Sequence, residues 1–168
     1  SKRIFESLKV WERIEVQGAT PIEKIHISDR GRFGFTRLAA SDAGVEALGF
    51  VVENRALGKA LKATLAQTSN LTFLCPALMQ EITFTPEAAR VTVMRGDRAE
   101  TLTARLVVAA DGGHSAVRSQ AGIEAQRTEY KQTALVTNVS VELAHHNIAY
   151  ERFTDSGPLA LLPMRERR

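Results

Sequence analysis

The sequence predicts an α+β or α/β chain organised around one strand–turn–helix corner within residues 102–123. Residues 106–110 form a short apolar run with β-branched members, which has the length of a buried strand. An Asp-Gly-Gly turn at 111–113 breaks the run, and successive glycines permit positive φ angles and close backbone approach. Ser115 then offers a helix N-cap. Such a corner can hold a phosphate or a ribose, although the same pattern also occurs in corners that bind no ligand.

The first half of the chain reads as helix, hairpin and helix. Apolar side chains at helical spacing predict one helix over residues 3–14, which turn residues at 18–21 end. Alternating apolar residues predict a hairpin over 22–38, with its turn at 28–31. Leucines at every fourth position predict a second helix over 53–67.

The second half reads mostly as short strands. A strand over 71–75 is followed by a hairpin, and a third strand over 100–110 completes a β-meander that leads into the corner. The remaining strands are predicted at 133–143, 149–154 and 159–164. His145 and His146 would point to opposite sides of an extended chain, so no metal site is expected there.

Composition excludes several classes of protein. The chain has 168 residues, of which 44% are hydrophobic and 24% charged, and this is typical of a globular domain. The net charge of +3 is small and is concentrated near the C-terminus, so no nucleic-acid surface is expected. Cys75 is the one cysteine and cannot form an intramolecular disulfide. We expect a cytoplasmic protein, and we leave open a peripheral association with the inner membrane or with a biosynthetic complex.

The run AADGGHSAVR at residues 109–118 resembles a cofactor fingerprint of FAD-dependent aromatic hydroxylases. The matching residues are Asp111, Gly112, Ser115 and Arg118, which the resemblance places beside FAD. Three further segments are similar to the branch of this family that acts in ubiquinone biosynthesis: HISDRGRFGF, ERFT and GPLALLPM.

This resemblance implies a fold and a division of the chain. The fold would be part of a Rossmann-like FAD/NAD(P)-binding domain of the glutathione-reductase type, together with part of a β-sheet substrate domain. Residues 1–21 would hold the first helix, and 22–50 the first part of the substrate domain. Residues 51–127 would belong to the FAD domain with its meander, and 128–168 to the substrate strands.

The resemblance also implies an activity and its site residues. The whole enzyme would be a monooxygenase that uses FAD, NAD(P)H and O₂ to hydroxylate a polyprenylated phenol. Asn54 would contact the flavin from the first turn of its helix. The substrate pocket would be formed by Phe153, Leu159, Leu161 and Pro163. No catalytic side chain is assigned, because the cofactor carries this chemistry.

Two further motifs of the resembled family are missing from this sequence. The glycines contain no G-x-G-x-x-G, and the one Gly-Asp pair, Gly96-Asp97, falls in a predicted hairpin turn. We therefore expect an internal fragment that is inactive and does not retain FAD by itself. The strand at 106–110 would lack its neighbours, and an open apolar edge predicts a dimer or higher assembly.

Two other functions remain open from the sequence. One is a flavin reductase or dehydrogenase of the same fold without oxygen chemistry. The other is a non-catalytic β-rich module that binds a lipid or a partner protein.

Overall fold

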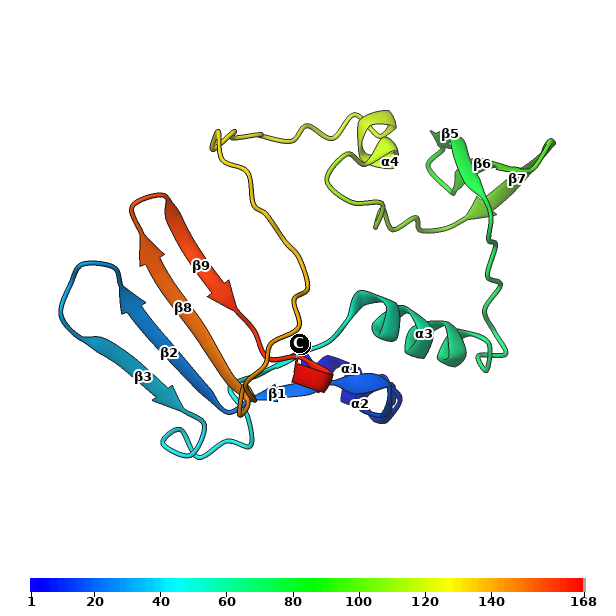
Figure 1. Ribbon diagram of the computed structural model, residues 1–168. Helices are drawn as coiled ribbons and strands as arrows, with labels where there is room; N and C mark the ends of the chain where they lie inside the picture. The colour runs from blue at the N-terminus through cyan, green and yellow to red at the C-terminus, as the bar shows by residue number, and fades with distance from the viewer. Residues whose placement is uncertain (168) are drawn as a thin grey trace. The chain divides into compact units, whose positions relative to one another are not determined.

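The computed structural model describes residues 1–167, which fold as two compact α+β units. Unit 1 comprises Ser1–Leu71 and the residues from Leu135 onward, and unit 2 comprises Thr72–Ala134. Figure 1 shows the elements of both units, which are described one at a time. These units do not follow the boundaries expected at residues 50 and 127, and the assignment to FAD and substrate domains stays a prediction.

Unit 1 contains three helices, α1 (Lys2–Ser7), α2 (Trp11–Gly18) and α3 (Asn54–Leu65). The prediction of a single helix over 3–14 is wrong, because α1 ends in a Schellman motif. Lys9 has a φ of +55°, its N–H donates to the Glu6 carbonyl, and the N–H of Val10 donates to the Phe5 carbonyl. Glycine usually occupies this left-handed position, and a lysine there gave no stop signal in the sequence.

The helices of unit 1 surround a small apolar core. Val10, Trp11, Ile14 and Ala60 are buried, and α2 packs on α3 through them. The Trp11 ring meets the Phe50 ring edge to face, with 4.9 Å between the centroids. The break after α1 therefore turns both Val10 and Trp11 into this core.

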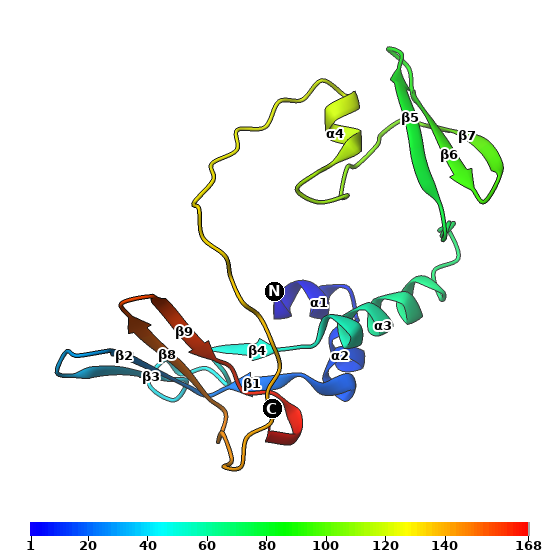
Figure 2. The same cartoon turned by 45° about the horizontal axis from the view of Figure 1, so that its top comes forward.

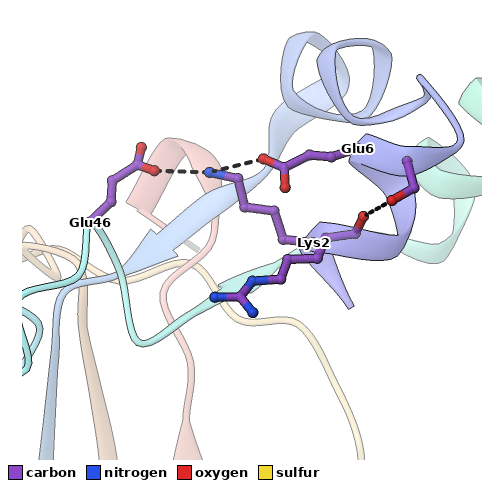
Figure 3. Close-up of polar contacts among 5 residues, drawn as sticks. Lys2, Glu6 and Glu46 are labelled. Carbon is purple, nitrogen blue, oxygen red and sulfur yellow. Dashed lines mark hydrogen bonds and ion pairs between the residues drawn. The ribbon is translucent and has the colours of Figure 1, made fainter.

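Lys2 lies over both rings of the same aromatic pair and reaches two glutamates, Glu6 and Glu46 (Figure 3). Its ammonium group lies 2.9 Å from Glu46 Oε2 and 3.8 Å from Glu6 Oε1, and 5.0 Å from the centre of the Phe50 ring. The hydrogen bond to Glu46 raises the pKa of Lys2 above its ordinary value of 10.5. The ion pair with Glu46 links α1 to the loop at residues 40–48, although an exposed ion pair stabilises a fold only slightly.

Two sheets complete unit 1 (Figure 2). β1 (Thr20–Ile22) pairs antiparallel with β4 (Gly49–Val51). A four-stranded sheet has the order β3-β2-β8-β9. Its strands are β2 (Lys24–Asp29), β3 (Phe35–Ala39), β8 (Ile148–Thr154) and β9 (Gly157–Leu161). A short 3₁₀ turn, η1 (Arg165–Arg167), follows β9 in the chain. The predicted hairpin at 22–38 and the last two predicted strands are thereby confirmed. β2 and β8 run parallel, so this sheet joins segments more than a hundred residues apart.

The turn before β8 fixes that parallel pairing. The Asn147 carbonyl accepts hydrogen bonds from the N–H groups of Glu23 and Lys24, and the Asn147 side chain donates to Glu23 Oε1 at 2.7 Å. His146 and Asn147 both have positive φ, so the two histidines lie in a tight turn and not in a strand. Among the described residues, no cluster of three metal-binding side chains forms.

Unit 2 contains a meander of β5 (Leu78–Phe84), β6 (Ala89–Arg95) and β7 (Arg98–Ala104), followed by α4 (Ala116–Gln120). The predicted hairpin, the third meander strand and the helix that follows Ser115 are confirmed, although β7 already ends at Ala104.

Three predicted strands are wrong, because residues 71–75, 105–110 and 133–143 form no strand. Leu106 and Val108 are each 78% exposed, and among the described residues the run finds no partner strand. An apolar run becomes a strand only when neighbours accept its hydrogen bonds. Self-association through this surface stays a prediction. In the part of the chain that is described, no helix has the length and apolar character needed to cross a bilayer.

Trp11→Ala is expected to destabilise unit 1 by about 3–5 kcal/mol, because it removes a large side chain from a closed core. Chemical denaturation followed by circular dichroism measures this free energy. Val16→Ala is the matched control on the same helix, since Val16 is 74% exposed and its loss should cost about 0.5 kcal/mol or less. Equal effects of the two variants would contradict the core described above.

Candidate functional site

The Asp-Gly corner of unit 2 is organised by the Asp111 carboxylate. Asp111 Oδ1 accepts a short hydrogen bond from the Ser115 hydroxyl, and Oδ2 accepts one from the N–H of Val117 at 3.3 Å. The carboxylate thus bridges the turn and the first residues of α4. Because its remaining lone pairs are free to accept, it can also receive a ligand hydroxyl.

Ser115 is the N-cap of α4, as the sequence predicts. Its Oγ accepts from the N–H of Arg118 at 2.9 Å, and the residue is only 4% exposed. The Arg118 guanidinium donates from Nη2 to the Gly113 carbonyl at 2.9 Å. The four residues that match the resembled fingerprint therefore meet in one hydrogen-bonded corner.

Gly112 gives the corner its shape and leaves its backbone open. Its φ of +86° lies where other residues are strained, and a Cβ built there would meet no atom within 4 Å. Among the described residues, the N–H groups of Gly112 and Gly113 make no hydrogen bond. These free donors suit the phosphate and hydroxyl oxygens of a dinucleotide such as FAD.

The corner also sets the charge of Asp111. The hydrogen bond from Ser115 is the largest cause, with the N–H of Val117 in support, and together they hold the pKa of the carboxyl below its ordinary value of 3.8. Asp111 is therefore ionised throughout the neutral range. An ionised carboxylate can accept hydroxyl hydrogen bonds from a ribose or ribityl chain, and it repels bare phosphate.

In unit 1, α3 begins without a side-chain cap, and Asn54 is its first residue. The N–H groups of the first helical turn have no intrahelical partners and can bind an anion or a hydroxyl. The exposed Asn54 side chain has no hydrogen-bond partner among the described residues. It is free to contact a ligand, as the resemblance implies.

A cavity of about 270 Å³ lies beside the same helix turn, within unit 1. Its charged and polar lining comprises Gln17, Thr20, Glu53, Arg55, Lys59, Arg165 and Glu166. Three cationic and two anionic side chains leave it weakly positive. Thr20 is only 6% exposed, so this cavity reaches a buried polar residue. The sequence did not reveal this cavity, because its lining comes from helix, strand and C-terminal segments.

The predicted substrate residues do not share one surface. Cross-strand register places Leu159 opposite Arg152 and Leu161 opposite Tyr150, whereas Phe153 lies opposite Pro158. Paired residues lie on the same face, and neighbours along a strand lie on opposite faces. Leu159 and Leu161 are therefore on one face of the sheet and Phe153 on the other, while Pro163 is fully buried.

The face that carries Leu159 and Leu161 also carries an aromatic cluster that the sequence did not reveal. The His26 ring stacks on Phe35 at 5.1 Å and lies 5.7 Å from Tyr150. Arg37 donates from Nε to His26 Nδ1 at 3.3 Å and lies over the Phe35 ring. We name this set, with Leu159 and Leu161, the aromatic face. No sequence signal marks this cluster, because one strand does not show its cross-strand neighbours.

His145 holds the segment that contains Pro163. Its Nδ1 accepts from the N–H of Asn147 at 3.0 Å, so the ring proton lies on Nε2 and is donated to the Met164 carbonyl at 2.7 Å. No sequence motif marks this contact, since it spans nineteen residues.

Comparison with known proteins shows which family and which relatives this chain matches. A model of the FAD binding domain family matches residues 3–168. Ubiquinone hydroxylase UbiL of Rhodospirillum rubrum is 35% identical over 163 residues, which cover 97% of this chain and 37% of that protein. The 3-demethoxyubiquinol 3-hydroxylase of Escherichia coli is 26% identical, over 98% of this chain and 41% of its own length.

The chain thus spans about two fifths of the length of these relatives. Among solved structures, the tetracycline destructase Tet(51) is similar with a TM-score of 0.50 and 11% identity, over 99% of this chain and 41% of the other. At this identity the likeness concerns the fold alone.

Ser115→Ala should raise the pKa of Asp111 toward 3.8, because it removes the donor that most stabilises the carboxylate. An NMR titration of the Asp111 carboxyl carbon measures this. Ser119→Ala is the control, since that hydroxyl donates to the Ser115 carbonyl and not to Asp111. Because the folded pKa is lowered, Asp111 stabilises the corner above pH 3.8 and this contribution is lost as the pH falls through the folded pKa. An unchanged Asp111 pKa in Ser115→Ala would contradict the bridge.

Proposed function

Since this chain belongs to the FAD binding domain family, we propose that it is the middle part of a flavin-dependent monooxygenase that hydroxylates a polyprenylated phenol in ubiquinone biosynthesis. NAD(P)H and O₂ would be the co-substrates. The observation that carries the proposal is the Asp-Gly corner, because its hydrogen bonds, free N–H donors and ionised carboxylate match the oxygen-rich part of FAD. The named relatives support the substrate class.

The residues of the corner would hold the cofactor. Asp111 would accept hydroxyl groups, and Gly112 would present a backbone N–H at close range. Ser115 and Arg118 would keep the turn closed around them. Asn54, at the uncapped start of α3, would donate or accept a hydrogen bond at the flavin. When bound, FAD supplies the redox chemistry by which one oxygen atom of O₂ enters the phenol.

We further propose that the aromatic face forms one wall of the substrate pocket. Its rings can stack on a phenol, its leucines can contact an isoprenoid chain, and Arg37 can stabilise a phenolate. These side chains orient the ring and exclude water, and they need no covalent role. Phe153, on the opposite face, would then lie outside this wall.

The function is tested by measuring NAD(P)H-dependent oxygen consumption by the intact, FAD-loaded enzyme that contains this chain, with a prenylated phenol as substrate. Formation of the hydroxylated phenol is the expected outcome. Asp111→Ala should cut FAD retention by about tenfold or more, since it removes both bridging hydrogen bonds as well as any bond to the cofactor. NAD(P)H oxidation without phenol hydroxylation would instead indicate a reductase. Binding of phenol without FAD would indicate a non-catalytic module.

The pocket wall is tested with a matched pair of substitutions on adjacent strands. Leu161→Ser should raise the KM for the phenol about tenfold, because a buried leucine–ligand contact is worth about 1.5–3 kcal/mol. Phe153→Ser changes a residue of similar exposure on the other face and should leave KM within about twofold. The reverse result would assign the wall to the opposite face of the sheet.

A further inference from the structure

Gln120, the last residue of α4, makes two hydrogen bonds to a strand that lies about forty residues earlier in the chain. Its side-chain Nε2 donates to the Gln80 carbonyl at 2.9 Å, and its Oε1 accepts from the N–H of Ile82 at 2.9 Å. A single carboxamide thus satisfies one acceptor and one donor of the β5 backbone. Among the described residues, these two hydrogen bonds join α4 to the meander.

The strand contacted by Gln120 is open on this side. β5 pairs only with β6, and the register shifts between Met79 and Glu81, which leaves Gln80 in a bulge. An open edge presents unpaired N–H and C=O groups to the solvent. The carboxamide occupies the place that one residue of an added strand would take. Together with Gln80, Glu81, Thr92 and Met94, Gln120 lines a wide, open hollow beside β5.

The other end of α4 is the Asp-Gly corner. Ser115 caps the helix, and Asp111 reaches the N–H of Val117. α4 has only five residues, and a helix of this length is not stable by itself. Its direction, and with it the direction of Asp111 and Arg118, therefore depends on what holds its second end.

We propose that Gln120 is a positioning residue for the cofactor corner, which it holds against the bulge of β5 through its carboxamide. This inference rests on the proposed function, in which the corner binds FAD. Gln120 would touch neither the cofactor nor the substrate. Its effect would pass through α4 to the four residues of the corner.

We call the two hydrogen bonds from the Gln120 carboxamide to β5 the clamp. The clamp has a chemical signature that simple packing lacks. It needs a donor and an acceptor on one planar group, so a carboxylate can replace only the acceptor and would repel the Gln80 carbonyl. A protonated carboxyl group carries both and would restore both bonds. The charged groups near this position are Glu81 on β5 and Arg118 on α4, while the β6 residues of the hollow, Thr92 and Met94, are uncharged.

The test uses the intact enzyme that contains this chain and measures its FAD dissociation constant by flavin fluorescence, for three variants at two pH values. Gln120→Leu should weaken binding about tenfold at both, since both hydrogen bonds to the β5 backbone are lost. The FAD affinity of Gln120→Glu should be as weak as that of Gln120→Leu at about pH 8. It should recover toward the wild-type affinity at about pH 4.5, close to the ordinary carboxyl pKa of about 4.3. Asp111 stays ionised there, because its pKa lies below 3.8. Gln80→Leu, which removes an exposed carboxamide from the same hollow and keeps the Gln80 carbonyl, should bind FAD as wild type does.

Two results would overturn the proposal. One is wild-type FAD affinity in Gln120→Leu, and the other is an equal loss in Gln120→Glu at both pH values. If the wild-type protein binds no FAD at all, the proposed function fails, and the clamp is judged separately by the pKa of Asp111. A shift of that pKa toward 3.8 in Gln120→Leu supports a positioned corner, and an unchanged value rejects it.

Discussion

The parallel pairing of β2 with β8 is the constraint on which unit 1 depends. It brings Lys24 beside Ile148 and makes one sheet of two hairpins, β2–β3 and β8–β9, that are separated by most of the chain. Parallel strands need a long crossover connection, and here the whole of unit 2 lies within that connection. Asn147 fixes the start of the pairing, because its carbonyl and its side chain both bond to the residues before β2.

The candidate cofactor corner follows a different physical rule. Its hydrogen bonds connect residues no more than six positions apart, so the turn itself is built from local contacts, and only its attachment to β5 through Gln120 involves a distant segment. The apolar run that leads into it has no such local source of stability and stays unpaired and exposed. A ligand-binding turn can thus be organised even where the sheet that would extend from it is not formed.

The four-stranded sheet shows how a period of two residues divides function between surfaces. Leu161, Tyr150 and His26 share one face of this sheet, because they lie in register across neighbouring strands. Phe153 belongs to a different surface with Pro158, although it is only three residues from Tyr150. Sequence similarity alone groups these residues together, and the pleat of the strands separates them.

What the sequence by itself determined is the local structure: the β2–β3 hairpin, the meander, helix α3, and the corner with Ser115 as its cap. Each depends on contacts between near neighbours, whose residue types and spacing are visible in one dimension. The sequence also indicated the FAD binding domain family, through Asp111, Gly112, Ser115 and Arg118. The tertiary structure alone decided the break at Lys9, the absence of strands at 105–110 and 133–143, the aromatic face around His26, and the clamp of Gln120 on β5. Except for the break at Lys9, which local hydrogen bonds close, these features depend on whether a distant partner is present, and no local pattern records that partner.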